Sequence, residues 1–225
     1  MKKYFIVLGL VLVFSCKKAE LAEPSGLNFY FENHQPINDS ELSKIPNKFQ
    51  GLFMNSDSVY LNIKENIILK ESFYKLKFHN KDMDSLKNEF VFSNGKYLAT
   101  HSNELFDYRK LKDSIELFKK EIDTFFIFSN SQKAKRISGQ LVLNIKDSIY
   151  WRIKVINLEK DVLKIKYIYS DDDLKRLDSV TKEKSKKIDS TSFIIRPTRR
   201  EFKSIINLKH LGEDMQYHKV SNSKT

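Results

Sequence analysis

Apolar and polar side chains alternate one by one along several stretches of this 225-residue chain. In residues 59–63 the apolar positions are Val59, Leu61 and Ile63, and residues 74–78 repeat the pattern with lysines at the polar positions. Successive side chains of a strand point to opposite faces of a sheet, so a period of two is typical of a strand that buries one face. The alternation therefore predicts a β-rich fold.

Polar turns separate the alternating stretches. Asn94-Gly95 lies between two apolar runs, and both residue types tolerate the positive φ that a two-residue hairpin turn requires. Closely spaced strands joined by short turns are typical of antiparallel sheets. We expect a mainly β protein, built as an antiparallel sandwich or as open, barrel-like sheets. Further strands are expected within residues 115–128, 141–145, 149–156, 162–168 and 192–196.

Two short helices are expected near the C-terminus. Ser170 or Asp171 can cap a helix over 171–180, and the acidic residues at its start suit the exposed N–H groups there. Thr198 can cap a second helix over 198–208, in which apolar residues share one face. The fold class becomes α+β if these helices pack on the sheet.

The N-terminus has the pattern of a secretion signal. Lys2 and Lys3 precede the uncharged, apolar run Tyr4–Phe14, and Ser15 stands before Cys16. The run is too short for a membrane-spanning helix, which needs about 20 residues. We expect cleavage before Cys16 and acylation of its thiol, for example by palmitate. The alternative is an ordinary signal peptide whose boundary happens to contain a cysteine.

These features predict a division of the chain. Residues 1–15 would be the signal peptide, and 16–44 a polar, proline-containing tether whose aromatic Leu27–Phe31 docks on the folded part. A single β-rich domain would span 45–220, and 221–225 would be a disordered tail. Residues 51–69 and 139–156 each contain a glycine, a strand, an Asp-Ser pair and a second strand, so an internal duplication stays open.

Composition limits the partners. The formal charge is +11, or +9 once Lys2 and Lys3 are removed with residues 1–15. The excess comes mainly from lysines spread along the strands, without a base-reading or stacking motif, so we expect no nucleic-acid partner. Cys16 is the only cysteine, which excludes an internal disulfide.

No catalytic motif is present. The sequence contains no nucleophile elbow, glycine-rich phosphate loop or paired histidines at metal spacing, so we expect no catalytic residues, cofactor or metal. Asp171-Asp172-Asp173 lacks the alternating ligands and glycine of a calcium loop, which favours the helix start. Trp151 is expected in the core, although it can also line a ligand cavity.

Three arginines near the C-terminus form the one candidate binding group. Arg196, Arg199 and Arg200 surround Pro197 just before the second expected helix. Guanidinium groups beside a helix N-terminus can bind a phosphate or carboxylate. The alternative is that these arginines are solvated or pair with acidic neighbours.

Three segments carry a resemblance to a known group of proteins: Phe14-Ser15-Cys16-Lys17-Lys18, the segment 45–51 and the segment 196–203. With them the chain resembles small uncharacterised lipoproteins of Bacteroidetes-type bacteria, and this resemblance implies no activity. We expect a lipoprotein of the cell envelope, held at the membrane by lipid on Cys16, that works as a non-enzymatic binding module. Its partner would be an envelope protein or a small ligand. Periplasmic and surface positions both stay open, and the alternative function is an envelope hydrolase with dispersed catalytic residues.

Overall fold

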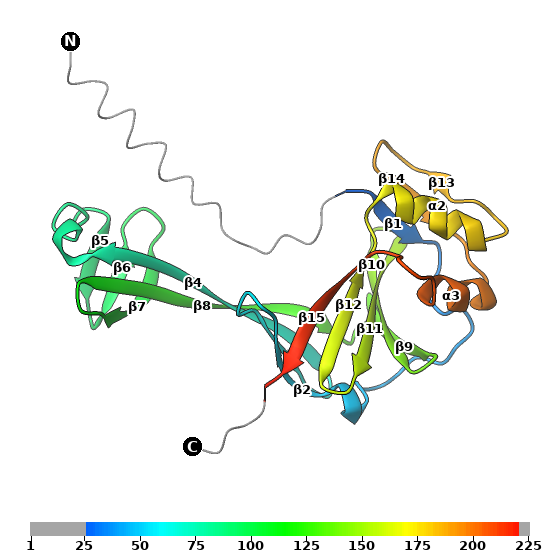
Figure 1. Cartoon of the computed structure of the whole chain (residues 1–225), viewed down its shortest axis with the longest axis horizontal. Helices are drawn as coiled ribbons and strands as arrows, with labels where there is room; N and C mark the ends of the chain where they lie inside the picture. Colours follow the sequence, from blue (N-terminus) through cyan, green and yellow to red (C-terminus); the bar gives the residue numbers. More distant parts are fainter. Residues whose placement is uncertain (1–25, 221–225) are drawn as a thin grey trace, which may run out of the picture. The chain divides into compact units, whose positions relative to one another are not determined.

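The computed structural model describes residues 26–220, and the fold is mainly β with two α-helices. The strands form a large mixed sheet that does not close into a barrel (Figure 1). No helix in the described part of the chain is both long and apolar enough to cross a membrane. Cys16, the expected signal peptide and the expected tail 221–225 all lie outside the described residues.

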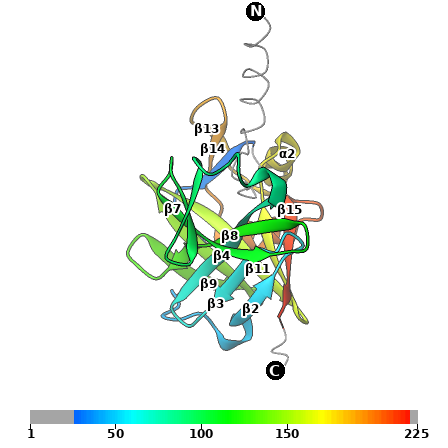
Figure 2. The ribbon, with the colours of Figure 1, turned by 90° about the vertical axis from the view of Figure 1, so that its left-hand side faces the viewer.

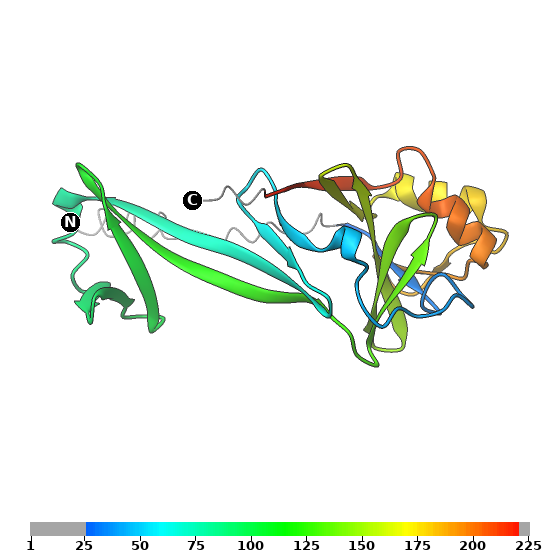
Figure 3. The ribbon, with the colours of Figure 1, turned by 90° about the horizontal axis from the view of Figure 1, so that it is seen from below.

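Contacts divide the described chain into two compact units. Unit 1 comprises residues 73–120, and unit 2 comprises residues 26–72 together with 121–220. Strands β4 (Ile67–His79) and β8 (Ser114–Ile127) are neighbours in the sheet, and each contributes residues to both units (Figure 3). The boundary therefore falls inside two strands and is not marked by a linker.

Unit 1 is a small sheet with an aromatic interior. Its strand order is β4, β8, β7, β6, β5, with β5 at Phe90–Ser93, β6 at Lys96–Ala99 and β7 at Glu104–Lys110. Strands β4, β7 and β8 are labelled in Figure 2. A 3-10 turn, η2, spans Asn80–Asp82. The buried centre is formed by three side chains, Phe106, Ile115 and Leu117, and is covered by partly exposed aromatic rings.

Unit 2 contains the larger part of the sheet. Its strand order is β13, β14, β1, β11, β12, β15, β2, β3, β4, and β10 and β9 extend from the other edge of β11. The bounds are β1 (Asn28–Phe31), η1 (Asn47–Phe49), β2 (Gly51–Met54), β3 (Tyr60–Ile63), β9 (Gln132–Ile137), β10 (Gln140–Asp147), β11 (Tyr150–Glu159), β12 (Val162–Tyr167), β13 (Lys186–Lys187), β14 (Ser192–Ile195) and β15 (Glu213–Lys219).

Both helices begin where their capping residues predict. Helix α2 spans Asp171–Val180 behind the N-cap Ser170, and α3 spans Arg199–Ile206 behind the N-cap Thr198. Each N-cap hydroxyl accepts a hydrogen bond from the third helical N–H, and the acidic residue there accepts one from the N-cap N–H.

Asp173 shows why the triple aspartate starts a helix. Its carboxylate accepts hydrogen bonds from the N–H groups of Tyr169, Ser170 and Gly212. Burial alone would raise the pKa of Asp173, but these hydrogen bonds outweigh it and hold the pKa below its usual value. Gly212 makes this possible because it has a φ of +62°, and a Cβ there would lie 2.1 Å from the Tyr167 carbonyl oxygen.

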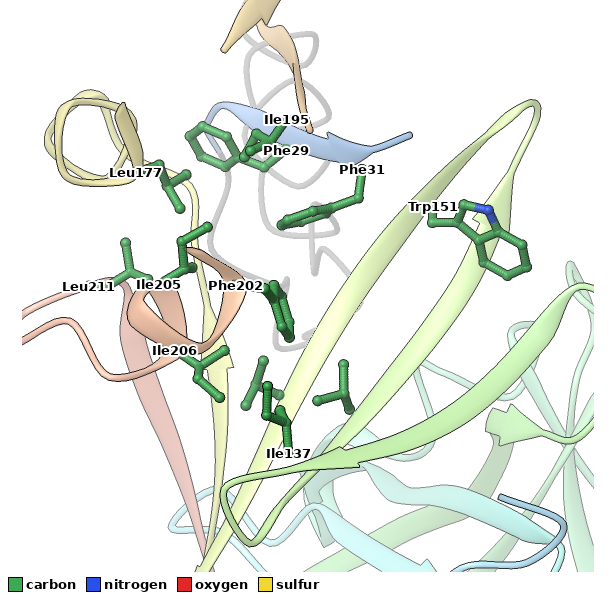
Figure 4. Close-up of a cluster of buried hydrophobic side chains, with 12 residues drawn as sticks. Phe29, Phe31, Ile137, Trp151, Leu177, Ile195, Phe202, Ile205, Ile206 and Leu211 are labelled. Carbon is green, nitrogen blue, oxygen red and sulfur yellow. The ribbon is translucent and has the colours of Figure 1, made fainter. Parts of the chain in front are cut away.

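The helices pack over a hydrophobic core of unit 2 (Figure 4). Phe202 of α3 meets Phe31 of β1 edge to face, with ring centroids 5.9 Å apart. Trp151 belongs to the same cluster and is 8% exposed, as expected of a core residue. The other buried members are Phe29, Ile137, Val142, Val155, Leu177, Ile195, Ile205, Ile206 and Leu211.

The expected turns are present. Ser93 and Lys96 pair across the Asn94-Gly95 turn, where both residues have positive φ. The two Asp-Ser pairs of the possible repeat also form hairpin turns, with φ values of 59° at Ser58 and 57° at Ser148. The two segments therefore share turn chemistry, and duplication stays a prediction.

One expectation differs from the structure. The sheet is not wholly antiparallel, because β1 runs parallel to β14 over four residue pairs. Within the expected tether over 16–44, residues 28–31 lie in the sheet as β1 with Phe29 and Phe31 buried, and the region 45–220, expected as a single domain, contains parts of both contact units. Four alternating residues at 28–31 suffice for a strand when both edges find partners, β14 on one side and β11 on the other.

Replacing Phe202 with alanine should destabilise unit 2 by about 3–5 kcal/mol, because it removes a fully buried ring and leaves a cavity against Phe31. Urea unfolding followed by Trp151 fluorescence measures the loss. Lys203→Ala, at an exposed position of the same helix, is the matched control and should change stability little. Equal losses in both variants would mean that α3 does not depend on this contact.

Candidate functional site

The three candidate arginines do not form an open anion site. The Arg196 guanidinium binds the carboxylates of Glu32 and Glu183, with N–O distances of 2.9 Å each. Arg199 binds Asp39 through two nitrogens, and the side chain of Arg200 is exposed. Two of the three cations are thus neutralised by carboxylates of the protein itself, which agrees with pairing to acidic neighbours.

The start of helix α3 is also occupied. Glu201 accepts hydrogen bonds from the N–H groups of Thr198 and Lys182, at 2.8 and 2.7 Å. These bonds lower the pKa of Glu201 below its usual value. A carboxylate of the chain therefore fills the position that an external phosphate or carboxylate would take at this helix end.

Arg196 and Arg199 bind the segment of residues 32–44, which lies between β1 and η1. Glu32 and Asp39, the partners of Arg196 and Arg199, both belong to it. On its other side the segment lies against β9 and β10, where the N–H of Leu42 donates to the carbonyl of Ala134. The 32–44 segment is therefore fixed from two sides.

A buried amide also binds this segment. Oδ1 of Asn144 accepts from the N–H of Gln35 at 2.6 Å, and Nδ2 of Asn144 donates to the Gln35 carbonyl at 2.8 Å. Asn144 is fully buried and Gln35 is 1% exposed. The Asn144 side chain thus hydrogen-bonds the backbone of Gln35 in the way that a neighbouring strand would. It gives partners to the N–H and the carbonyl of Gln35, whose burial without hydrogen bonds would be unfavourable.

Lys135 is the one buried cation in this region. Lys135 is 1% exposed, and its Nζ donates a hydrogen bond to the carbonyl of Pro36 at 2.8 Å. Burial lowers the pKa of Lys135, an effect opposed by the negative charges of Glu41 and Asp39. The ammonium therefore holds the chain at the cis Gln35-Pro36 bond.

His34 lies next to these groups. Its ring stands edge-on to Trp151 with centroids 5.2 Å apart, and its Nε2 is 3.6 Å from Oε1 of Glu41. Lys133 binds the same Glu41 carboxylate and holds its pKa below the usual value. Nδ1 of His34 and Oε1 of Gln35 are buried without a hydrogen-bond partner among the described residues.

The remaining histidines do not converge on this cluster. His79 and His101 belong to unit 1, and His210 and His218 lie in the loop before β15 and in β15 itself. Over residues 26–220, no group of three or more histidine, cysteine, aspartate or glutamate side chains could hold a metal ion. The cluster around Lys135 is arranged to fix a loop, and its chemistry is hydrogen bonding and charge pairing.

Two hollows in unit 2 are lined by side chains that the sequence did not single out. An open groove of about 750 Å³ lies between residues 54–57 and β15. A smaller one of about 280 Å³, beside the end of α3, is lined by Lys164, Lys166 and Lys209. Lys164 and Lys166 are already paired with Glu159 and Asp214, as the arginines are with their own carboxylates.

Unit 1 presents an uncovered apolar surface. Val91, Leu98 and Leu105 are direct cross-strand partners on β5, β6 and β7. They point away from the aromatic interior, to which their neighbours Phe90, Ala99 and Phe106 belong. Val91 is 44% exposed and Leu105 54% exposed. These three residues are called the outward stripe, and an exposed apolar patch of this kind is typical of an interaction surface.

Sequence reasoning missed the residues that matter most here. Asn144, Gln35 and Lys135 carry no local signal, because their roles depend on contacts across about a hundred residues of chain. A signal did exist for the outward stripe. Phe90-Val91-Phe92 is apolar at three successive positions, which places apolar side chains on both faces of the strand.

Comparison with protein-family models, curated proteins and solved structures gives no match to this chain.

Asn144→Leu should destabilise unit 2 by about 1–3 kcal/mol, because the buried N–H and carbonyl of Gln35 lose their partners while the volume is kept. Chemical unfolding measures the effect. Asn157→Leu is the matched control, since that amide binds the exposed Glu159, and it should change stability by about 0.5 kcal/mol or less. A neutral Asn144→Leu would show that the 32–44 segment does not need this pairing.

The stability of unit 2 should fall on mild acidification, partly through His34. Burial, and then the charges of Lys135 and Lys133, lower the pKa of His34 below its usual 6.5. The unfolded chain therefore takes up the proton first as the pH falls below 6.5, which favours unfolding until the folded-state pKa is passed. We expect His34→Gln to lose less stability than the wild type between neutral and mildly acidic pH.

Unfolding curves at several pH values provide the measurement. His218→Gln, at an exposed position of β15, is the control and should follow the wild type. If His34→Gln kept the full pH dependence, the titration would have to be assigned to other groups.

Proposed function

We propose that this chain is a lipid-anchored protein of the bacterial cell envelope, and that its folded units act as a non-enzymatic binding module. The observation that carries the proposal is the N-terminal order of Lys2-Lys3, a short apolar run and Ser15-Cys16. Lipid on Cys16 would hold the mature chain at a membrane. The chain has no other cysteine, so its thiol chemistry is concentrated at this junction.

The outward stripe supports the binding role. Val91 and Leu105 are exposed on unit 1 and their cross-strand neighbour Leu98 is partly exposed, although unit 1 buries only a small core of its own. Leaving such side chains in water is unfavourable, and exposed apolar patches on folded proteins often mark sites where a partner binds. An envelope protein or a small apolar ligand is the class of partner that such a surface fits.

Mass spectrometry of the chain purified from bacterial membranes tests the anchor. We expect Cys16 to be the first residue and to carry acyl groups, because cleavage before a lipid-modified cysteine leaves that residue at the mature N-terminus. Cys16→Ala should abolish the modification and release the chain from washed membranes. Ser15→Ala, which keeps a small residue before the cysteine, is the control and should stay membrane-bound. Membrane-bound chain with an unmodified Cys16 would overturn the proposal.

A further inference from the structure

We propose that β15 has a strand-addition site, at which an extended, basic peptide segment of a partner protein pairs antiparallel with residues 213–217. The free edge of β15 over these residues is called the open edge. The site lies in unit 2 and needs neither the lipid anchor nor the outward stripe, so it goes beyond the proposed function.

Strand β15 is paired along the whole of one edge and only at one end of the other. On one side, β12 pairs with residues 213–218 (Figure 1). On the other side, β2 pairs only with His218 and Lys219. The open edge is therefore five residues long, or roughly 15 Å.

A buried asparagine is the reason that β2 stops there. Oδ1 of Asn55 accepts hydrogen bonds from the N–H groups of Asp57 and Val59, at 3.0 and 2.9 Å. These bonds turn the chain toward β3 directly after Met54. The groove of about 750 Å³ lies where β2 would have continued, between residues 54–57 and β15.

Backbone groups of β15 face this groove without a partner. The N–H of Lys219 donates to the carbonyl of Asp161, at the end of β15 that pairs with the start of β12. Hydrogen-bonded residues alternate along an antiparallel ladder, so the odd-numbered residues of β15 bond to β12. Asp214 and Gln216 direct their N–H and carbonyl groups into the groove, where no described strand meets them. An extended peptide can bond to both residues through its own backbone.

The charge of the groove identifies the class of peptide. Asp57 and Glu213 are exposed, and Asp57 forms no ion pair with any described residue. Asp214 is paired with Lys166 at 2.8 Å. The chain as a whole has a formal charge of +11, so a negative groove is a local exception to which basic side chains are complementary.

A second copy of β15 would fit this edge poorly, because it would bring the same acidic residues against each other. Met54 and Met215 supply the apolar part of the groove. Methionine side chains are flexible and pack against varied partners. Backbone pairing, negative charge and methionine contacts together favour an extended basic segment.

A capped, dye-labelled pentapeptide, Val-Lys-Val-Lys-Val, is the probe. Directly opposed residues share a face, so antiparallel addition places its lysines beside Asp214 and Gln216. Fluorescence anisotropy measures binding to residues 16–225 carrying Cys16→Ala, and we expect a Kd below about 1 mM. The same peptide with both lysine nitrogens methylated keeps every side chain but lacks the donors that face β15. It should bind at least several-fold more weakly.

Matched variants test the backbone contact from the side of the protein. Gln216→Pro removes the N–H that faces the groove, and proline is tolerated at an edge where the N–H points away from the paired strand. We expect at least a several-fold loss of peptide binding. Gln216→Ala keeps the N–H and should bind as the wild type does. Amide hydrogen exchange of the wild type is independent of these variants: the peptide should slow exchange at Gln216 more than at Tyr217, which already bonds to β12.

A second matched pair tests the charge. Asp57→Asn should weaken binding of the lysine peptide about two- to fivefold, the range of an exposed ion pair. Asp123→Asn changes the net charge equally at an exposed position of β8 in unit 2 that does not line the groove, and should leave binding unchanged.

Several results would overturn the proposal, and each leaves lipidation of Cys16 standing. These are no binding below about 1 mM, equal binding of the methylated peptide, or equal binding by Gln216→Pro and Gln216→Ala. Equal losses in Asp57→Asn and Asp123→Asn would remove the basic peptide as the partner. Protection of Gln216 without peptide would assign the open edge to a second copy if it rises with protein concentration, and otherwise to another segment of the same chain.

Discussion

Strand β11 uses both of its edges, and the arrangement of unit 2 depends on those hydrogen bonds. On one edge it pairs with β10 over residues 150–156. On the other edge it pairs with β1 at Trp151 and with β12 from residue 155 onward. Through β1 it supports β14 and the helices, through β10 the contacts of Asn144, and through β12 the path to β15 and β2. A strand buried in this way needs side chains that pack on both faces, and Trp151, Val155 and Ile156 provide them.

Charge in unit 2 is used mainly to fix the chain. Arg196 and Arg199 bind Glu32 and Asp39, Lys133 binds Glu41, and Lys44 binds Glu65, so four ion pairs hold the 32–44 segment. Each exposed ion pair contributes little to the free energy of unfolding. The hydrogen bonds between Asn144 and Gln35 are buried, and without them these polar groups would have no partner. The ion pairs therefore select the position of the segment, and the buried amide supplies more of its stability. Unit 1 differs at β4, where Lys75 and Lys77 are exposed and form no ion pair with a described residue.

The sequence predicted the features that depend on near neighbours. The helix starts at Ser170 and Thr198 followed from capping chemistry, and the Asn94-Gly95 turn from the φ values that these residues allow. It did not predict the parallel pairing of β1 with β14, since residues 28–31 and 192–195 are joined only through the folded chain.

The sequence also did not predict the division into two units, because no local signal marks the boundary. The chain passes from one unit to the other inside β4 and β8, where the alternation continues and no glycine or proline marks a boundary. The three arginines were recognised as a group, but their partners Glu32, Asp39 and Glu183 lie far enough along the chain that no local pattern could connect them. Local sequence patterns predict individual helices and strands. Which distant strands pair depends on the surfaces that they bury, and a local pattern does not contain this information.

The sheet ends differently at its two terminal strands, and this difference affects the chain before it has folded completely. Strand β13 is two residues long, and both are lysines, a composition that discourages another strand from adding to that edge. At the other end β5 reads Phe-Val-Phe-Ser and has only β6 as a neighbour. An apolar edge strand is a template for intermolecular pairing, so crowding of incompletely folded chains should favour aggregation through residues 90–93. The same four residues would then limit the concentration at which newly made chains fold without aggregating.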